Sequence, residues 1–104
     1  MKTKLKELRE ELLEKIHELL NNKHNGHFMF PDDTRIHKYV NNDLTDVVEV
    51  YQASELRITE DSLVIVYKLE CFFEDYSDYD YDEISFMLIH ESTDTLMKIY
   101  EELE

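Results

Sequence analysis

The residues with the greatest chemical potential are concentrated in one acidic stretch, residues 74–83. This decapeptide holds six carboxylates, three tyrosines and no basic residue. Carboxylates bind hard cations such as calcium and magnesium, and they also bind lysine and arginine side chains of other proteins. The stretch therefore indicates either a cation site or a surface that recognises a basic protein. The candidate binding residues are Glu74, Asp75, Asp78, Tyr79, Asp80, Tyr81, Asp82 and Glu83.

The spacing of Asp78, Asp80 and Asp82 is similar to the opening of an EF-hand calcium loop. That loop also needs glycine at its sixth position and a bidentate glutamate at its twelfth. With Asp78 as the first position, these two places are held by Glu83 and Ile89, and other starting residues fail as well. The EF-hand is therefore excluded, and we assign no metal site and no cofactor. A divalent-cation site without a fixed motif stays open as an alternative function.

A third interpretation of the acidic stretch is molecular mimicry. If residues 76–83 are extended, Asp78, Asp80 and Asp82 project from one face at intervals of about 7 Å. Such a row imitates a phosphate backbone and could occupy the basic groove of a nucleic-acid-binding protein. The plainest interpretation is a solvated, self-repelling loop whose tyrosines cover the edge of a sheet.

Charge is distributed unevenly along the chain. Residues 1–38 hold eight basic and seven acidic residues, a net charge of +1, whereas residues 39–104 hold three and eighteen, a net charge of −15. A field of this sign repels nucleic acids and anionic membranes and attracts basic proteins. We therefore expect a basic protein surface as the partner, with no nucleic acid and no membrane.

Other reactive residue types form no recognised site. The chain has one glycine, whereas P-loops, dinucleotide-binding turns and nucleophile elbows each need at least two. His24, His27 and His37 match no established metal-site spacing, so we interpret them as polar loop residues. The single Cys71 cannot form an internal disulfide, and we interpret it as a small core residue. The sequence therefore predicts a protein that is not an enzyme.

The strongest structural signal is the alternation of side-chain types within residues 62–73, which is typical of a half-buried strand. Its odd-numbered residues, such as Leu63 and Ile65, are predicted to face the core. A turn at residues 59–62 folds this strand back on residues 47–58 to form an antiparallel hairpin. The predicted pairing is uninterrupted, and it includes Ile58–Leu63, Leu56–Ile65, Ala53–Lys68, Tyr51–Glu70, Val50–Cys71 and Val48–Phe73.

Two amphipathic helices flank this hairpin. Leucine and isoleucine recur at spacings of three and four within residues 3–22, which predicts a helix whose leucine stripe packs on the sheet. Gly26 is the natural left-handed residue at or just past its C-terminus. Ser92 supplies N-cap chemistry for a short final helix. The buried stripe of that helix is predicted to be Leu96, Ile99, Tyr100 and Leu103.

Weaker patterns indicate the remaining elements. Residues 34–40 predict a short strand, residues 41–43 a loop, and the apolar residues 84–89 another strand. The resulting order is a helix, three or four antiparallel strands and a helix. The sequence therefore predicts one α+β two-layer domain over residues 1–104.

Two further expectations concern surroundings and self-association. Lysines interrupt the leucines at the start of the chain, so we expect neither a signal peptide nor a membrane span, and a cytoplasmic location. Phe28, Met29 and Phe30 form an apolar patch, and this patch or an uncovered strand edge could support a homodimer.

The layout of the whole chain resembles a group of small acidic proteins. It combines a Leu/Glu/Lys helix ending at Asn25-Gly26-His27-Phe28, a meander of valines and acids, and Ser92-Thr93-Asp94-Thr95-Leu96 opening a short acidic helix. In these features it is similar to small hypothetical proteins of Bacteroides-type gut bacteria and their mobile elements. That group has no assigned activity, so the resemblance implies no functional residues.

Overall fold

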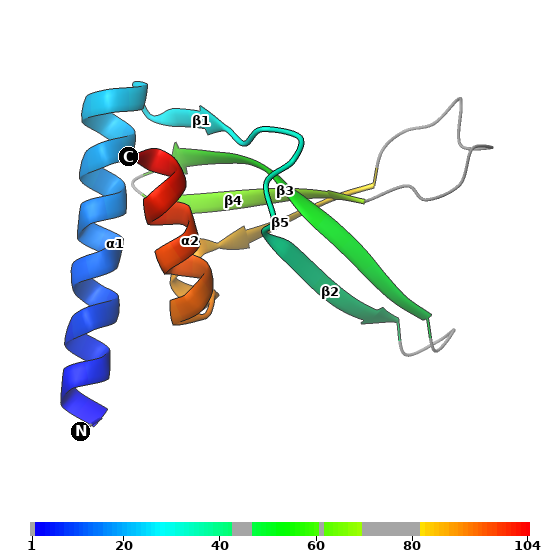
Figure 1. Ribbon diagram of the computed structural model, residues 1–104, viewed down its shortest axis with the longest axis horizontal. Helices are drawn as coiled ribbons and strands as arrows, with labels where there is room; N and C mark the ends of the chain where they lie inside the picture. The colour runs from blue at the N-terminus through cyan, green and yellow to red at the C-terminus, as the bar shows by residue number, and fades with distance from the viewer. Residues whose placement is uncertain (1, 43–46, 61, 70–81) are drawn as a thin grey trace.

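The computed structural model describes residues 2–42, 47–60, 62–69 and 82–104, and it confirms the predicted α+β class (Figure 1). The elements run in the order helix, five antiparallel strands, one 3₁₀ turn and helix. Their bounds are α1 Lys2–His24, β1 His27–Met29, β2 His37–Asn42, β3 Val47–Thr59, β4 Ser62–Leu69, β5 Glu83–Met87, η1 Leu88–His90 and α2 Thr93–Leu103. The described sheet has five strands, one more than the three or four expected. The additional strand is the short β1, which the sequence showed only as an apolar patch.

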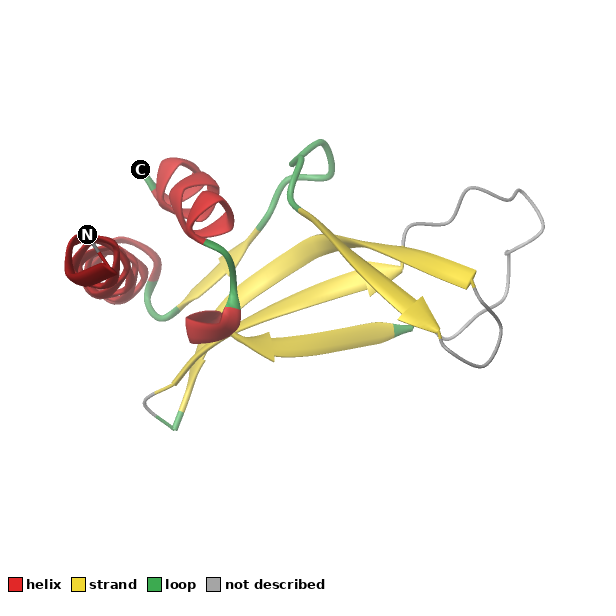
Figure 2. Cartoon of the chain, turned by 90° about the horizontal axis from the view of Figure 1, so that it is seen from below, coloured by secondary structure: helices red, strands yellow, loops and turns green. Residues whose placement is uncertain are grey.

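The long strand β3 organises the sheet. β4 pairs along one side of β3, and β5 continues the sheet beyond β4. Two strands share the other side of β3: β1 pairs with residues 55–57 and β2 with residues 47–52. Both helices lie together at one end of this sheet, and the opposite end projects beyond them (Figures 1 and 2).

Helix α1 ends through left-handed backbone, as the sequence predicts. Asn25 and Gly26 have φ values of 58° and 85°, and the Gly26 amide donates to the Leu20 carbonyl at 2.7 Å. This is the usual way in which a helix satisfies its last carbonyls. The helix is three residues longer than the predicted 3–22, because it begins at Lys2 and ends at His24.

The leucine stripe of α1 is only partly buried. Leu12, Ile16 and Leu20 belong to the core, but Leu5 and Leu8 are 54% and 43% exposed. The prediction that the whole stripe packs on the sheet is therefore wrong for the first turns. The reason is one of length, since α1 extends past the beginning of α2 (Figure 1).

The hairpin of β3 and β4 follows the predicted register only near its turn. Ile58–Leu63 and Leu56–Ile65 pair as expected, but the register shifts between Ala53 and Glu55. Ser54 is the extra residue of a β-bulge, which moves the following side chains to the opposite face.

Beyond the bulge the predicted pairs are wrong. Tyr51 pairs with Leu69 and Ala53 with Tyr67, and both Tyr51 and Ala53 face the core at 6% and 4% exposure. The predicted inward residue Val48 is 57% exposed instead. The predicted partners Glu70, Cys71 and Phe73 lie outside the described residues.

The inward face of β4 is confirmed for its described residues. Ile65 and Tyr67 are fully buried, and Leu63 and Leu69 pack against the same core. Val66 is buried as well, at 2% exposure, although the alternation places it on the wetter face.

The remaining predicted strands and the final helix are present with shifted bounds. β2 begins later than expected and includes Asn41 and Asn42, which pair with β3, so the loop prediction is wrong for these two residues. The apolar run 84–89 is divided between β5 and η1.

In α2, the Ser92 hydroxyl accepts from the Thr95 amide at 3.2 Å. The predicted stripe faces inward, with Leu96, Ile99 and Leu103 fully buried and Tyr100 packed against them. Neither described helix carries an apolar stretch long enough to cross a membrane.

Candidate functional site

Only the last two residues of the acidic candidate site are described. Asp82 and Glu83 are exposed where β5 begins, and the Leu69 amide donates to the Asp82 carbonyl at 3.0 Å. This bond holds the end of β4 beside the start of β5. The other candidates lie outside the described residues: Glu74, Asp75, Asp78, Tyr79, Asp80 and Tyr81.

The acidic sequence segments join the described sheet at one end. β2 ends and β3 begins at the end that projects away from the helices, and β4 ends and β5 begins there too (Figure 2). The intervening residues 43–46 carry two acids and residues 70–81 carry five, and neither segment contains lysine or arginine. This projecting end, with Asp82 and Glu83, is the candidate interaction surface.

The electrostatics around Tyr51 show the sign of the potential at this end. Tyr51 Oη donates to Glu49 Oε2 at 2.7 Å. This hydrogen bond to Glu49, together with burial and the negative charges of Glu49 and Asp82, raises the pKa of Tyr51 to about 12. A carboxylate on β3 and one directly before β5 therefore act on one hydroxyl and oppose its ionisation.

A buried carboxylate that the sequence analysis missed lies on the helix side of the sheet. Glu91 is 4% exposed, and both of its oxygens lie 3.4 Å from Lys38 Nζ. The same ammonium group lies 4.3 Å from the centre of the Phe86 ring. These contacts tie β2 to the segment that precedes α2. The only sequence signal for them is that Glu91 lies two positions after the apolar run 84–89.

Tyr67 completes this buried cluster. Burial raises the pKa of Tyr67 above its usual range, and the Glu91 carboxylate adds to the rise. The Tyr67 hydroxyl is enclosed and makes no hydrogen bond of ordinary geometry to any described residue. A buried carboxylate beside a hydroxyl can serve acid–base chemistry, but neither groove described below is lined by Glu91, Tyr67 or Lys38. In the described structure the cluster connects β2 with the segment that precedes α2.

Comparison with known proteins gives no family. No protein-family model, curated protein or solved structure matches the chain. The resemblance to small proteins of Bacteroides-type gut bacteria therefore stays a prediction, and function has to be inferred from charge, burial and contacts.

The histidines named above do not converge. His24 Nε2 donates to the Leu103 carbonyl at 3.0 Å, whereas His27 Nε2 lies 2.9 Å from Glu55 Oε2 on β3. His37 begins β2, so these side chains belong to helix and strand ends rather than to loops. Within the described part of the chain, no three histidine, cysteine or acidic residues form a group that could hold a metal ion.

Two open grooves cross the described surface. The first has a volume of about 280 Å³ and lies beside the bulge, with Phe30, Gln52 and Lys68 among its lining residues. The second has a volume of about 380 Å³ and lies between α1 and the turn end of β4 and β5. Its lining residues are Leu13, Glu14, His17, Ser62, Leu63, Met87 and Ile89.

The apolar patch around Phe28 is largely internal. Phe30 is 6% exposed and Phe28 packs against the core, so only Met29 of the three residues is exposed. The two phenylalanine rings pack edge to face, with centres 5.2 Å apart. A homodimer through this patch would therefore rest on Met29 alone.

Proposed function

We propose that the chain is a small cytoplasmic, non-enzymatic interaction protein whose projecting acidic end binds a basic protein surface. The observation that carries this proposal is the position of the charge. Residues 43–46 and 70–81, which together carry seven acids and no lysine or arginine, attach at the end of the sheet that the helices leave uncovered. An uncovered end with a net negative charge favours rapid, salt-dependent encounter with a basic partner.

The environment of Tyr51 supports this proposal from described residues. Glu49 and Asp82 raise its pKa together, so their charges act in the same region. The opposite, helix-bearing side of the molecule is closer to neutral, because α1 and α2 together hold seven basic and eight acidic residues. The protein is therefore electrically polarised, which orients an approaching basic partner toward the projecting end.

The sharpest form of the proposal is an inhibitor that occupies the basic groove of a nucleic-acid-binding protein. An immunity protein that neutralises a basic toxin presents the same requirement, since both partners expose lysine and arginine. Both forms predict contacts made mainly by Asp78, Asp80 and Asp82, with binding that weakens as salt increases.

The decisive experiment compares two triple variants with the same change in charge. Immobilised wild-type protein is exposed to a cell lysate at low salt, and proteins released by increasing salt are identified. We expect basic, nucleic-acid-associated proteins, which are lost with Asp78→Asn/Asp80→Asn/Asp82→Asn. The matched control, Asp94→Asn/Glu101→Gln/Glu102→Gln, removes three exposed carboxylates from α2 and should retain them.

Equal losses in both variants would show that net charge alone is responsible, and salt-insensitive capture would contradict the electrostatic account.

A thermal melt with and without millimolar calcium separates the cation-binding alternative from the interaction proposal. Binding to the native state must raise the unfolding midpoint, so a rise that disappears in the Asp78/Asp80/Asp82 variant would replace the interaction proposal.

A further inference from the structure

Strand β5 is an edge of the sheet in the part of the chain that the structure describes. It pairs with β4 along one side, and no described strand lies on its other side (Figure 2). An edge strand presents backbone amides and carbonyls that can pair with another chain, and proteins commonly protect such edges. The free side of β5 is therefore a potential contact surface.

The hydrogen bonds between β4 and β5 show which backbone groups lie on this free side. The Leu69 amide donates to the Asp82 carbonyl at 3.0 Å, so these two residues form a hydrogen-bonded pair in the register of the two strands. Such pairs alternate along an antiparallel ladder, and the residues between them direct their backbone groups away from the neighbouring strand. On β5 the outward-directed residues are Glu83, Ser85 and Met87.

The side chains of β5 leave its edge less protected than that of β2. β2 carries Lys38, whose ammonium group points inward to Glu91, and an inward-pointing charge is one of the devices that prevent an edge from pairing with another chain. β5 contains no lysine and no proline. Its inward residues Ile84 and Phe86 are apolar and only partly buried against the core.

We propose that a second copy of this chain pairs with β5, forming a dimer in which the two β5 strands run antiparallel about a two-fold axis at Ser85. Ser85 then exchanges both backbone hydrogen bonds with Ser85 of the other copy. On the inner face, Ile84 of each copy lies opposite Phe86 of the other, and aromatic residues paired with β-branched residues stabilise a sheet. On the outer face, Glu83 lies opposite Met87, so no carboxylate meets its own copy. The contact is isologous and closes after two subunits.

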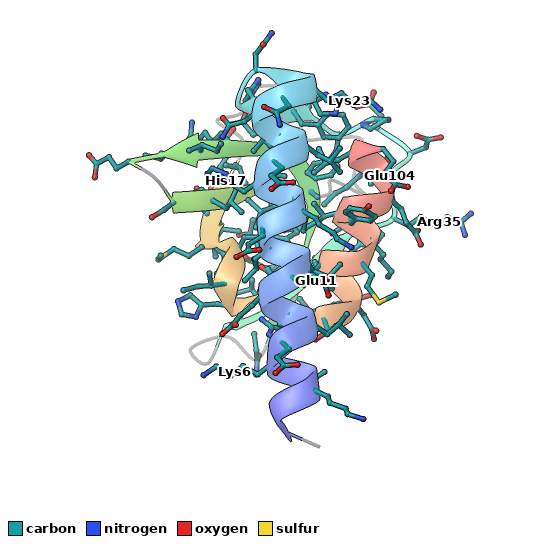
Figure 3. The ribbon with its side chains drawn as sticks, turned by 90° about the vertical axis from the view of Figure 1, so that its left-hand side faces the viewer. Lys6, Glu11, His17, Lys23, Arg35 and Glu104 are labelled. Carbon is teal, nitrogen blue, oxygen red and sulfur yellow. The ribbon has the colours of Figure 1, made fainter. Side chains whose placement is uncertain are left out.

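The distribution of charge around β5 favours this antiparallel arrangement. Arg9 donates to the carbonyls of Ile89 and Glu91 at 3.0 and 2.7 Å, so a guanidinium group lies beside η1, directly after β5. Lys6 projects from the flank of α1 on the same side (Figure 3). The dimer places the start of one β5, with its exposed Asp82, next to η1 of the other copy. A carboxylate of each copy therefore approaches basic groups of the other, and the acidic projecting ends point in opposite directions.

A second copy fits the edge better than an extended segment of a basic partner. β5 carries one carboxylate, at its first residue, so charge along the strand does not select a basic segment. A second copy instead supplies an apolar side chain opposite each inward residue. The dimer does not rest on the proposed function, because Ser85 is not one of the candidate binding residues, and each proposal can fail without the other.

The first test blocks the free side of β5. Sedimentation of the full chain from micromolar to millimolar concentration should show a dimer for the wild type. Ser85→Pro removes an amide that points away from β4, so it should preserve the β4–β5 ladder and weaken the dimer by at least about tenfold. Circular dichroism and a thermal melt check that the variant is folded.

Tyr39→Pro is the matched control on the other edge of the sheet. The Ala53 amide donates to the Ile36 carbonyl, so by the same alternation the Tyr39 amide points away from β3. Tyr39→Pro therefore removes an outward-directed amide from β2, and it should leave the dissociation constant of the dimer unchanged.

The second test uses the fact that Ser85 meets its own copy at the two-fold axis. Ser85→Lys places two ammonium groups opposite each other, and Ser85→Glu places two carboxylates there, so each variant alone should dimerise more weakly than the wild type. In a mixture of the two variants, opposite charges meet at the axis. An affinity tag on one variant should therefore recover the other as a heterodimer.

A wild-type chain that stays monomeric up to millimolar concentration overturns the proposal. So does a dimer that Tyr39→Pro weakens and Ser85→Pro leaves unchanged, because the contact then lies at β2. A mixture of Ser85→Lys and Ser85→Glu that forms no heterodimer overturns the two-fold pairing at Ser85.

Discussion

The two ends of the sheet differ in how deeply their side chains are buried, although the same strands form both. At the end covered by α1 and α2, Leu56 and Ile65 are completely buried, whereas Val48 and Tyr39 at the projecting end are 57% and 69% exposed. β3 runs through both ends. The difference shows that one half of a strand can stabilise a core while the other half presents a charged surface. This requires the side chains to change faces between the two halves.

The side chains of β3 change faces at the bulge residue Ser54. The Phe30 amide donates to the Ser54 carbonyl at 2.9 Å, and the Ala53 amide donates to the Ile36 carbonyl at 2.9 Å. The residue after β1 and the residue before β2 therefore meet at the bulge from the same side of β3. The extra residue lets Tyr51 and Ala53 face the core although Leu56 and Ile58, on the other side of the bulge, do so as well.

Deletion of Ser54 should have the largest effect. A continuous register turns either Leu56 and Ile58 or Tyr51 and Ala53 away from the core, because side-chain faces alternate along a strand. We expect a loss of at least about 4 kcal/mol in unfolding free energy, or no cooperative unfolding. Ser54→Ala keeps the length and should change stability by less than about 1 kcal/mol. Urea denaturation measures both, and a deletion as mild as the substitution would show that the bulge is dispensable.

Truncation of apolar side chains should separate the two ends directly. Leu56→Ala removes atoms from a fully buried position, so we expect a loss of about 2–5 kcal/mol. Val48→Ala removes atoms that already contact water, and it should change stability by less than about 0.5 kcal/mol. Urea midpoints at constant slope give both values. Similar losses would mean that the projecting end is covered in solution.

The Lys38–Glu91 pair links the two ends, and its loss should have an intermediate effect. Glu91→Ala leaves the half-buried Lys38 ammonium without its carboxylate, and we expect a loss of about 2 kcal/mol. Lys38→Met/Glu91→Leu replaces both charges with apolar groups and should recover part of that loss. A double-mutant cycle built from Lys38→Met, Glu91→Leu and the double variant tests the coupling by urea denaturation. Additive effects of the two single substitutions would show that the pair is not coupled.

The sequence predicts those parts of the fold that depend on neighbouring residues. The inward face of β4, the left-handed Gly26 and the Ser92 cap all follow from local chemistry, and each is confirmed. The bulge at Ser54 could not be predicted, since it depends on hydrogen bonds to segments at Phe30 and Ile36. Periodicity identifies a helix face but does not show where its partner ends, which is why Leu5 and Leu8 were expected in the core.

The candidate site was predictable in composition but not in position. The charge of residues 74–83 can be counted in the sequence. That this segment joins the sheet at its uncovered end can be known only from the order of the strands. The burial of Glu91 was not predictable because its partner Lys38 lies 53 positions earlier in the chain. A carboxylate with a remote lysine partner has no local signature that distinguishes it from a solvated one.

The smallest effect concerns Tyr51 and is visible only in alkali. The pKa of Tyr51 rises from 10.0 to about 12 in the folded protein, chiefly through its hydrogen bond to Glu49. The stabilisation is complete below pH 10 and is lost as the pH rises toward 12, because the unfolded chain releases this proton first. Burial also raises the pKa of Tyr67, so Tyr51→Phe should make the alkaline decline shallower without abolishing it. Urea midpoints from about pH 9 to pH 12 measure this slope.

Tyr39→Phe, at an exposed tyrosine on the neighbouring strand, should leave the slope of the alkaline decline unchanged. If Tyr51→Phe and Tyr39→Phe decline alike, the carboxylates of the projecting end do not act on Tyr51 in solution.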